Sequence, residues 1–158
     1  MKRLLVRLLY GNGKFRSYEQ IIIDKVIQVL EPTTADILRH QLEASDIKQR
    51  SSLDKMLIIG FSFERLDYQG LLFPNRSDEL RIATVKLRAL NSRRQIKVEI
   101  VAAEGLIATM KFSHSPRELE DGFEIIEVEV GPAPQVPEVP VEPLDHVPAS
   151  LSLHLSGY

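Results

Sequence analysis

The chain has 158 residues, of which 44% are hydrophobic and 27% charged, and these values are typical of one globular domain with its own core. Its formal net charge is −2 and it contains no cysteine. This composition excludes a disulfide scaffold and thiolate chemistry, and it provides no strong field for attracting nucleic acid or an anionic membrane. The absence of cysteine fits a reducing compartment but is also compatible with a periplasmic protein. With no nucleic-acid-binding motif and few aromatic residues besides, we expect a cytoplasmic protein that binds neither nucleic acid nor membrane.

The first ten residues combine basic and apolar side chains, as secretory signals do. However, Arg7 interrupts the apolar run, and no small-residue cleavage site follows Tyr10, so a signal peptide is not expected. The segment from Leu4 to Tyr10 is instead compatible with a short strand. A turn should follow at residues 11–13, Gly-Asn-Gly, because both residue types tolerate positive φ.

A first helix is predicted directly after this turn. Apolar residues recur at spacings of three and four between Phe15 and Val29, which places one apolar stripe on a helix from about Ser17 to Leu30.

A second helix should follow Pro32, which interrupts the first. Thr33 or Thr34 can cap it through a side-chain oxygen, and we expect the helix to run from Ala35 to about Lys48. Its polar residues would be available to solvent or to a partner: Arg39, His40, Glu43 and Lys48.

After Lys55 the apolar spacing changes to two, which is typical of strands. The predicted strands are 56–63, 81–89, 95–102, 106–113 and 123–130. Short turns such as Glu104-Gly105 favour an antiparallel meander. On the fourth of these strands the expected inner face contains Leu106, Ala108, Met110 and Phe112. The last strand carries three glutamates and should lie at an edge of the sheet.

The fold class predicted from this order is α+β, with two N-terminal helices packed on an antiparallel β-meander and an extended proline-rich tail. Six of the nine prolines lie between Pro132 and Pro148, which favours polyproline conformations. We expect one domain over 1–130 and the tail over 131–158. Leu151, Leu153 and Leu155 alternate with polar residues, so the tail can either remain a flexible appendage or dock on a sheet edge and make a homo-oligomer.

No catalytic or metal-binding motif is present. His40 and Glu43 are three residues apart on the predicted helix and can share a face, but no second half-site accompanies them, so we predict a solvated helix face without metal or cofactor. A site assembled from distant residues would use the remaining polar candidates, which are Arg76, Asp78, Glu79 and His114.

Two resemblances concern the second half of the chain and the order of its elements. The run LLFPNRSDELR at 71–81, followed by GLI at 105–107 and MKFS at 110–113, resembles a recurrent pattern of uncharacterised bacterial proteins and implies no activity. The order of helices before a meander is similar to the SMI1/KNR4-like superfamily of bacterial immunity proteins, although this chain has no tryptophan. That similarity implies a small α+β scaffold that binds and neutralises a toxin.

Our leading hypothesis from the sequence is a non-enzymatic intracellular module that binds a protein partner, with an immunity protein as one form of it. The alternative is a small enzyme or ligand-binding domain that uses the four distant polar residues named above.

Overall fold

The computed structural model describes residues 13–62, 72–74 and 79–131. The helices are α2 (Ser17–Val29), α3 (Pro32–Ala44) and the short 3-10 helix η2 (Pro116–Leu119). The strands are β1 (Ile47–Arg50), β2 (Met56–Gly60), β3 (Leu80–Ala89), β4 (Gln95–Ala103), β5 (Leu106–Phe112) and β6 (Phe123–Val130). This arrangement confirms the α+β class. The predicted strand at 4–10 and the tail beyond Gly131 lie outside the described residues.

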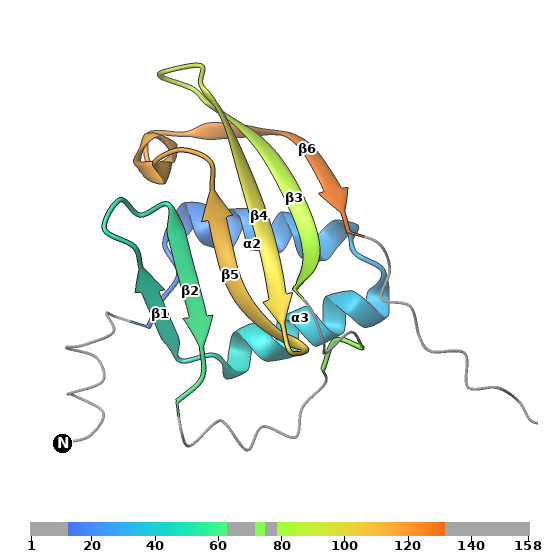
Figure 1. Ribbon diagram of the computed structural model, residues 1–158. Coiled ribbons are helices and arrows are strands. Elements are labelled where there is room, and N and C mark those ends of the chain that lie inside the picture. The colour runs from blue at the N-terminus through green and yellow to red at the C-terminus, as the bar shows by residue number, and fades with distance from the viewer. Residues whose placement is uncertain (1–12, 63–71, 75–78, 132–158) are drawn as a thin grey trace, which may run out of the picture.

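The strands form one six-stranded sheet in the order β1-β2-β5-β4-β3-β6, and every neighbouring pair is antiparallel. Both helices cover the same face of the sheet (Figure 1). The meander of β3, β4 and β5 is as predicted, and its β4–β5 turn has positive φ at both Glu104 and Gly105, as tight hairpin turns require. After β5 the chain passes through η2 and returns to pair β6 with β3, which confirms that the last strand lies at an edge.

Helix α2 agrees with the predicted range. Tyr18, Ile22 and Val26 are buried against the sheet, whereas Val29 is 47% exposed and lies outside the core. At the start of the helix the backbone N–H of Arg16 donates to Glu19 Oε2 at 2.7 Å, a local contact of the kind found in capping boxes.

Helix α3 differs from the prediction at both ends. It begins at Pro32, which is well tolerated in the first helical turn, and its cap is Glu31, whose carboxylate accepts hydrogen bonds from the backbone N–H groups of Thr33 and Thr34. It ends at Ala44 because Ser45 returns to extended backbone. The predicted threonine cap and the predicted end at Lys48 were therefore wrong. Lys48 lies on β1 and is 3% exposed.

Bulges shift the alternation of the meander strands β3 and β5, and a third irregularity skips Ile126 on β6. Strict alternation along β3 would place Ile82 on the polar face. The register skips this residue, however, and Ile82 is buried, with 4% of its surface exposed. On β5 the register skips Ala108, so Ile107 joins Met110 and Phe112 in the core. The predicted inner face through Leu106 and Ala108 was wrong, because one extra residue reverses the side on which the preceding residues point.

A buried amide joins α3 to the sheet. Gln41 is fully buried, and its Nε2 donates to the carbonyl of Gly105 at 2.9 Å while its Oε1 accepts from the N–H of Ile107 at 2.7 Å. Backbone groups at the β4–β5 turn thereby obtain partners within the protein interior. This contact fixes the position of α3 over the sheet.

Candidate functional site

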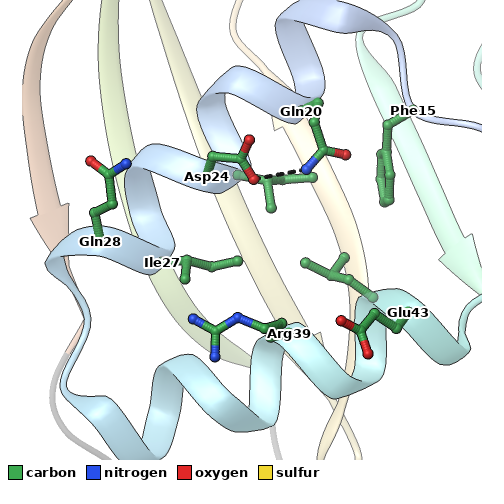
Figure 2. Close-up of a pocket in the computed structure, with 9 residues that line it drawn as sticks. Phe15, Gln20, Asp24, Ile27, Gln28, Arg39 and Glu43 are labelled. Atoms are coloured by element: carbon green, nitrogen blue, oxygen red, sulfur yellow. Dashed lines mark hydrogen bonds between the residues drawn. The ribbon is translucent and has the colours of Figure 1, made fainter.

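A groove of about 620 Å³ lies between α2 and α3. Figure 2 shows side chains of both helices converging on it, with Phe15 at the end where the chain enters α2. The lining residues are Phe15, Gln20, Ile23, Asp24, Ile27, Gln28, Arg39, Leu42 and Glu43. The groove therefore has walls from two helices, each held on the sheet by its own buried face.

The base of the groove is apolar. Ile23 is 2% exposed, and Phe15, Ile27 and Leu42 are half-buried hydrophobic residues packed against the core. Residues of this kind release water when a further apolar side chain covers them.

The polar residues of the groove leave an excess of negative charge. Arg39 lines the groove, but its charge is already paired, because its Nη1 lies 2.5 Å from Asp36 Oδ1. Asp24 accepts a hydrogen bond only from the neutral amide of Gln20 at 2.8 Å, and Glu43 has no hydrogen bond or ion pair in the part of the chain that the structure describes. Two carboxylates in the groove are therefore uncompensated by direct ion pairs.

Glu43 also lies where a carboxylate does not favour the helix. It is in the last turn of α3, which contains no basic residue, and the free carbonyl groups at a helix C-terminus carry partial negative charge. Helix stability therefore does not explain an acidic residue at this position.

Lys48 lies beside Phe15, one of the residues that line the groove. Its Nζ donates to the carbonyl and the hydroxyl of Ser45, at 2.6 and 2.8 Å, and lies 4.8 Å from the centre of the Phe15 ring. Burial lowers the pKa of Lys48 below its ordinary value. The amine satisfies groups at the end of α3 and supports Phe15, which is a structural role.

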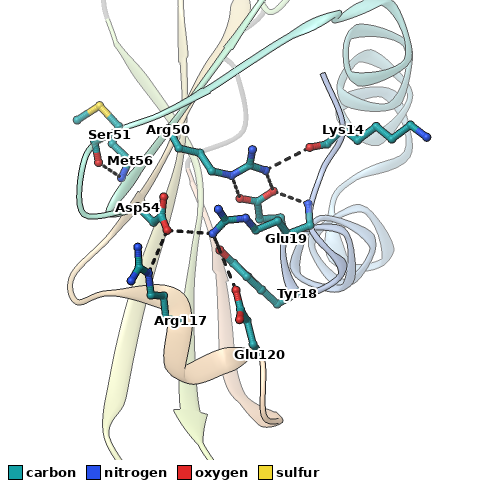
Figure 3. Close-up of polar contacts among 10 residues, drawn as sticks. Lys14, Tyr18, Glu19, Arg50, Ser51, Asp54, Met56, Arg117 and Glu120 are labelled. Carbon is teal, nitrogen blue, oxygen red and sulfur yellow. Dashed lines mark hydrogen bonds and ion pairs between the residues drawn. The ribbon is translucent and has the colours of Figure 1, made fainter. Parts of the chain in front are cut away.

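A second polar cluster joins the start of α2 to β1 (Figure 3). Arg50 donates from Nε and Nη2 to the two carboxylate oxygens of Glu19, at 3.0 and 2.5 Å. The side chain of Glu19 is 1% exposed and that of Arg50 is 16% exposed. A bidentate pair this well covered has its charges satisfied, so it holds the helix to the strand and leaves little for a ligand to bind.

Asp54 extends this cluster to η2. Its Oδ2 lies 3.1 Å from Arg16 Nη1 and 3.4 Å from Arg117 Nε. Burial on its own would raise the pKa of Asp54, but the hydrogen bonds and charges of the two arginines outweigh that effect and hold the pKa below its usual value. Burial raises the pKa of the neighbouring Tyr18 hydroxyl. These groups tie three segments together.

The structure does not bring Glu79 and His114 together. Glu79 precedes β3 at the end of the sheet that holds the β4–β5 turn, whereas His114 follows β5 at the opposite end. Glu79 lies 3.7 Å from Lys111, and His114 Nδ1 lies 3.0 Å from the hydroxyl of Ser113. The other predicted site residues lie outside the described part of the chain: Arg76, Asp78, Leu151, Leu153 and Leu155.

His40 and Glu43, which the sequence suggested as a possible metal-binding pair, lie in different surroundings in the structure. His40 contacts the backbone carbonyl of Asp36 through Nδ1 at 2.8 Å, while Glu43 faces the groove. Within residues 13–62, 72–74 and 79–131, no group of three or more His, Asp or Glu side chains is arranged to hold a metal ion.

One feature of the sequence indicates the position of the groove, namely a regular spacing of polar residues on α2. Gln20, Asp24 and Gln28 are polar and four residues apart on α2, so they follow one line along the helix. Together with Arg39 and Glu43 on α3, they outline a polar margin. The missing information was the relative placement of the two helices, which periodicity within one helix does not provide.

Comparison with protein-family models, curated proteins and solved structures found no match for this chain. None of the helices in the described ranges combines the length and apolarity required to cross a bilayer. A functional proposal for this chain therefore depends on the geometry and charge of the residues described above.

Proposed function

We propose that the chain is a non-enzymatic protein-binding module whose contact surface is the groove between α2 and α3. Its partner contributes a short amphipathic segment that carries Lys or Arg beside apolar residues. The observation that carries this proposal is the apolar base of the groove lying next to Asp24 and Glu43, whose charges no ion pair in the described structure compensates.

The two kinds of residue have separate roles in such binding. Each apolar side chain that a partner buries in a groove contributes roughly 1.5–3 kcal/mol, so two of them give a weak, reversible contact before the entropic cost of association is subtracted. The carboxylates attract a basic partner and fix its orientation. Recognition of an amphipathic segment by an apolar groove is a common mode of protein binding.

The face of the sheet opposite the helices offers a weaker case, because several of its charges already pair across the strands. Lys86 pairs with Glu127 at 2.5 Å, and Arg88 pairs with Glu124 at 2.7 Å, in both cases between β3 and β6. A partner on this face would compete with these ion pairs. At Glu43 no ion pair within the described ranges would compete in this way.

Two ideas from the sequence have less support. Neutralisation of a toxin is one role that such a module can have, and it stays a prediction about the identity of the partner. The alternative of a small enzyme has no converging acid and base among its described candidates, because Glu79 and His114 are at opposite ends of the meander.

The proposal predicts a charge preference that synthetic peptides can measure. Two 12-residue helical peptides would carry leucines at the same positions. All remaining positions would be Lys in the first peptide and Glu in the second. Calorimetry with the full chain should give an affinity for the Lys peptide about tenfold or more above that for the Glu peptide, a difference of about 1.4 kcal/mol. The double variant Asp24→Lys/Glu43→Lys should lose or reverse this preference.

The matched control is Asp121→Lys, which exchanges an exposed acid for a base at a position after η2. This variant should keep the preference for the Lys peptide. The single variant Glu43→Gln should weaken binding of that peptide yet stabilise the fold by roughly 0.3–1 kcal/mol, because it removes a negative charge from a helix C-terminus. Equal binding of both peptides to the unmodified chain, or a lost preference in the control, would contradict the proposal.

A further inference from the structure

Strand β6 has a neighbouring strand on one side only. It ends the strand order next to β3 (Figure 1), and no strand among the described residues pairs with its other side. It has eight residues, whereas β1 at the opposite edge has four. An edge strand of this length presents a row of backbone donors and acceptors to which a further strand can be added.

The hydrogen bonds between β6 and β3 determine which backbone groups this edge offers. The carbonyl of Gly122 accepts from the N–H of Leu90, and the N–H of Gly131 donates to the carbonyl of Ile82. Alternate residues of an antiparallel strand point towards the same neighbour, and the irregularity at Ile126 shifts this alternation by one residue. The N–H and C=O groups that point away from β3 therefore belong to Phe123, Ile125, Val128 and Val130.

The same four residues form an apolar row on the face of the sheet that the helices cover. Residues paired across two strands share a face, and the β3 partners of this row are all fully buried: Ala89, Leu87, Val85 and Ala83. On β6 itself the covering is incomplete, because Phe123, Ile125 and Val128 are only half-buried and Val130 is 43% exposed. Part of the apolar row is therefore open at the edge.

The opposite face of β6 is acidic, because Glu124, Glu127 and Glu129 alternate with the apolar row. Glu129 has no ion pair in the ranges that the structure describes. Two copies of β6 that paired antiparallel about a two-fold axis would bring the glutamates of both copies together on one face. Like charges on facing strands are unfavourable, so this edge suits a basic strand better than a second copy of itself.

We propose that β6 accepts a strand from a protein partner in which Val or Ile alternates with Lys or Arg. The partner backbone would bond to the outward groups of Ile125 and Val128, and its apolar side chains would cover the open part of the row. Its basic side chains would lie beside Glu127 and Glu129. No residue of β6 lines the groove between α2 and α3, so this surface is separate from the groove and does not depend on the proposed function.

Amide hydrogen exchange in the full chain tests strand addition residue by residue. The probe is a seven-residue peptide of alternating Lys and Val, present at ten times its dissociation constant. We expect exchange of the Ile125 and Val128 amides to slow about tenfold, because each gains an acceptor on the added strand. The amides of Glu127 and Glu129 point towards β3 and should change less. A peptide of alternating Glu and Val should bind at least tenfold more weakly.

Two variants separate backbone pairing from charge. Val128→Pro removes one outward N–H, and proline is tolerated on an edge strand where the N–H faces solvent, so this variant should bind the Lys–Val peptide about tenfold more weakly. Val128→Ile keeps the N–H and is the matched control, with unchanged binding. Glu129→Lys should lower the affinity for the Lys–Val peptide and raise that for the Glu–Val peptide, and it tests the proposal even if Val128→Pro disturbs the fold.

Three results would overturn this inference. The first is protection confined to the groove, for example at Ile27 and Glu43, with Ile125 and Val128 unchanged. The second is equal affinity of the unmodified chain for the two peptides. The third is a dimer in sedimentation analysis that protects Ile125 and Val128 without any peptide, which would assign this edge to a second copy. None of these results depends on whether a helical peptide binds in the groove, so the proposed function is tested separately.

Discussion

Single side chains in this protein show which charges are satisfied and which are not. Asp54 belongs to the satisfied group, because Arg16 and Arg117 hold its pKa below the usual value of 3.8. A carboxylate with a lowered pKa in the folded state adds stability at pH values above its unfolded pKa, and this contribution is lost as the pH falls through the folded pKa. The cluster should therefore loosen in acid.

We expect Asp54→Asn to lower the free energy of unfolding by about 1.5–3 kcal/mol at pH 7, the range for hydrogen bonds to charged groups. Asparagine tolerates the left-handed backbone at this position, where φ is +55°, so the change tests charge. Urea denaturation at pH 7 and at successively lower values should show the difference between the two proteins shrinking below about pH 4. The exposed Asp121→Asn serves as a control without an effect of this size. A difference that stayed constant with pH would contradict the role given to Asp54.

At the scale of elements, the pairing of β6 with β3 depends on a close approach at Gly131. Its N–H donates to the carbonyl of Ile82 at 2.7 Å, and a Cβ built at this position would lie 1.8 Å from the carbonyl oxygen of Arg81. Gly131→Ala should therefore force the backbone apart and cost about 1–3 kcal/mol, as other overpacked sites do. Amide hydrogen exchange should locate the loss of protection at the end of β6.

Gly60→Ala on β2 is the matched control, because its Cβ would meet Ile47 at an ordinary contact distance of 3.5 Å. We expect this variant to be as stable as the unmodified chain or slightly more so, because Gly is unfavourable within strands. If Gly131→Ala were tolerated equally well, β6 would not approach the bulge of β3 as described.

The sequence predicted elements well where a repeated spacing extended over many residues. Helix α2 and the meander of β3, β4 and β5 were found in this way. The errors came from single residues that interrupt a pattern: Glu31 caps α3 through its side chain, and the bulges at Ile82 and Ala108 shift the alternation. Lys48 was assigned to a helix, whereas it lies on a four-residue strand that is too short to display a period.

For the molecule as a whole, the layered arrangement determines where a binding surface can form. Both helices cover one face of the sheet (Figure 1), and the open face carries charges paired across its strands. The seam between the helices combines apolar side chains with Asp24 and Glu43, neither of which has an ion pair among the described residues. The candidate site was not predictable from the sequence because it belongs to this layering, and of the distant polar residues selected from the sequence the two that the structure describes, Glu79 and His114, do not line it.

The central proposal, that this seam binds a basic amphipathic segment, is tested most directly by mapping where such a segment binds. The isotope-labelled full chain would be titrated with the Lys peptide while its backbone amide shifts are recorded. We predict that the largest shifts occur along the groove, at Gln20, Asp24, Ile27 and Glu43. Shifts confined to the open face of the sheet, at Lys86 and Arg88, would contradict it.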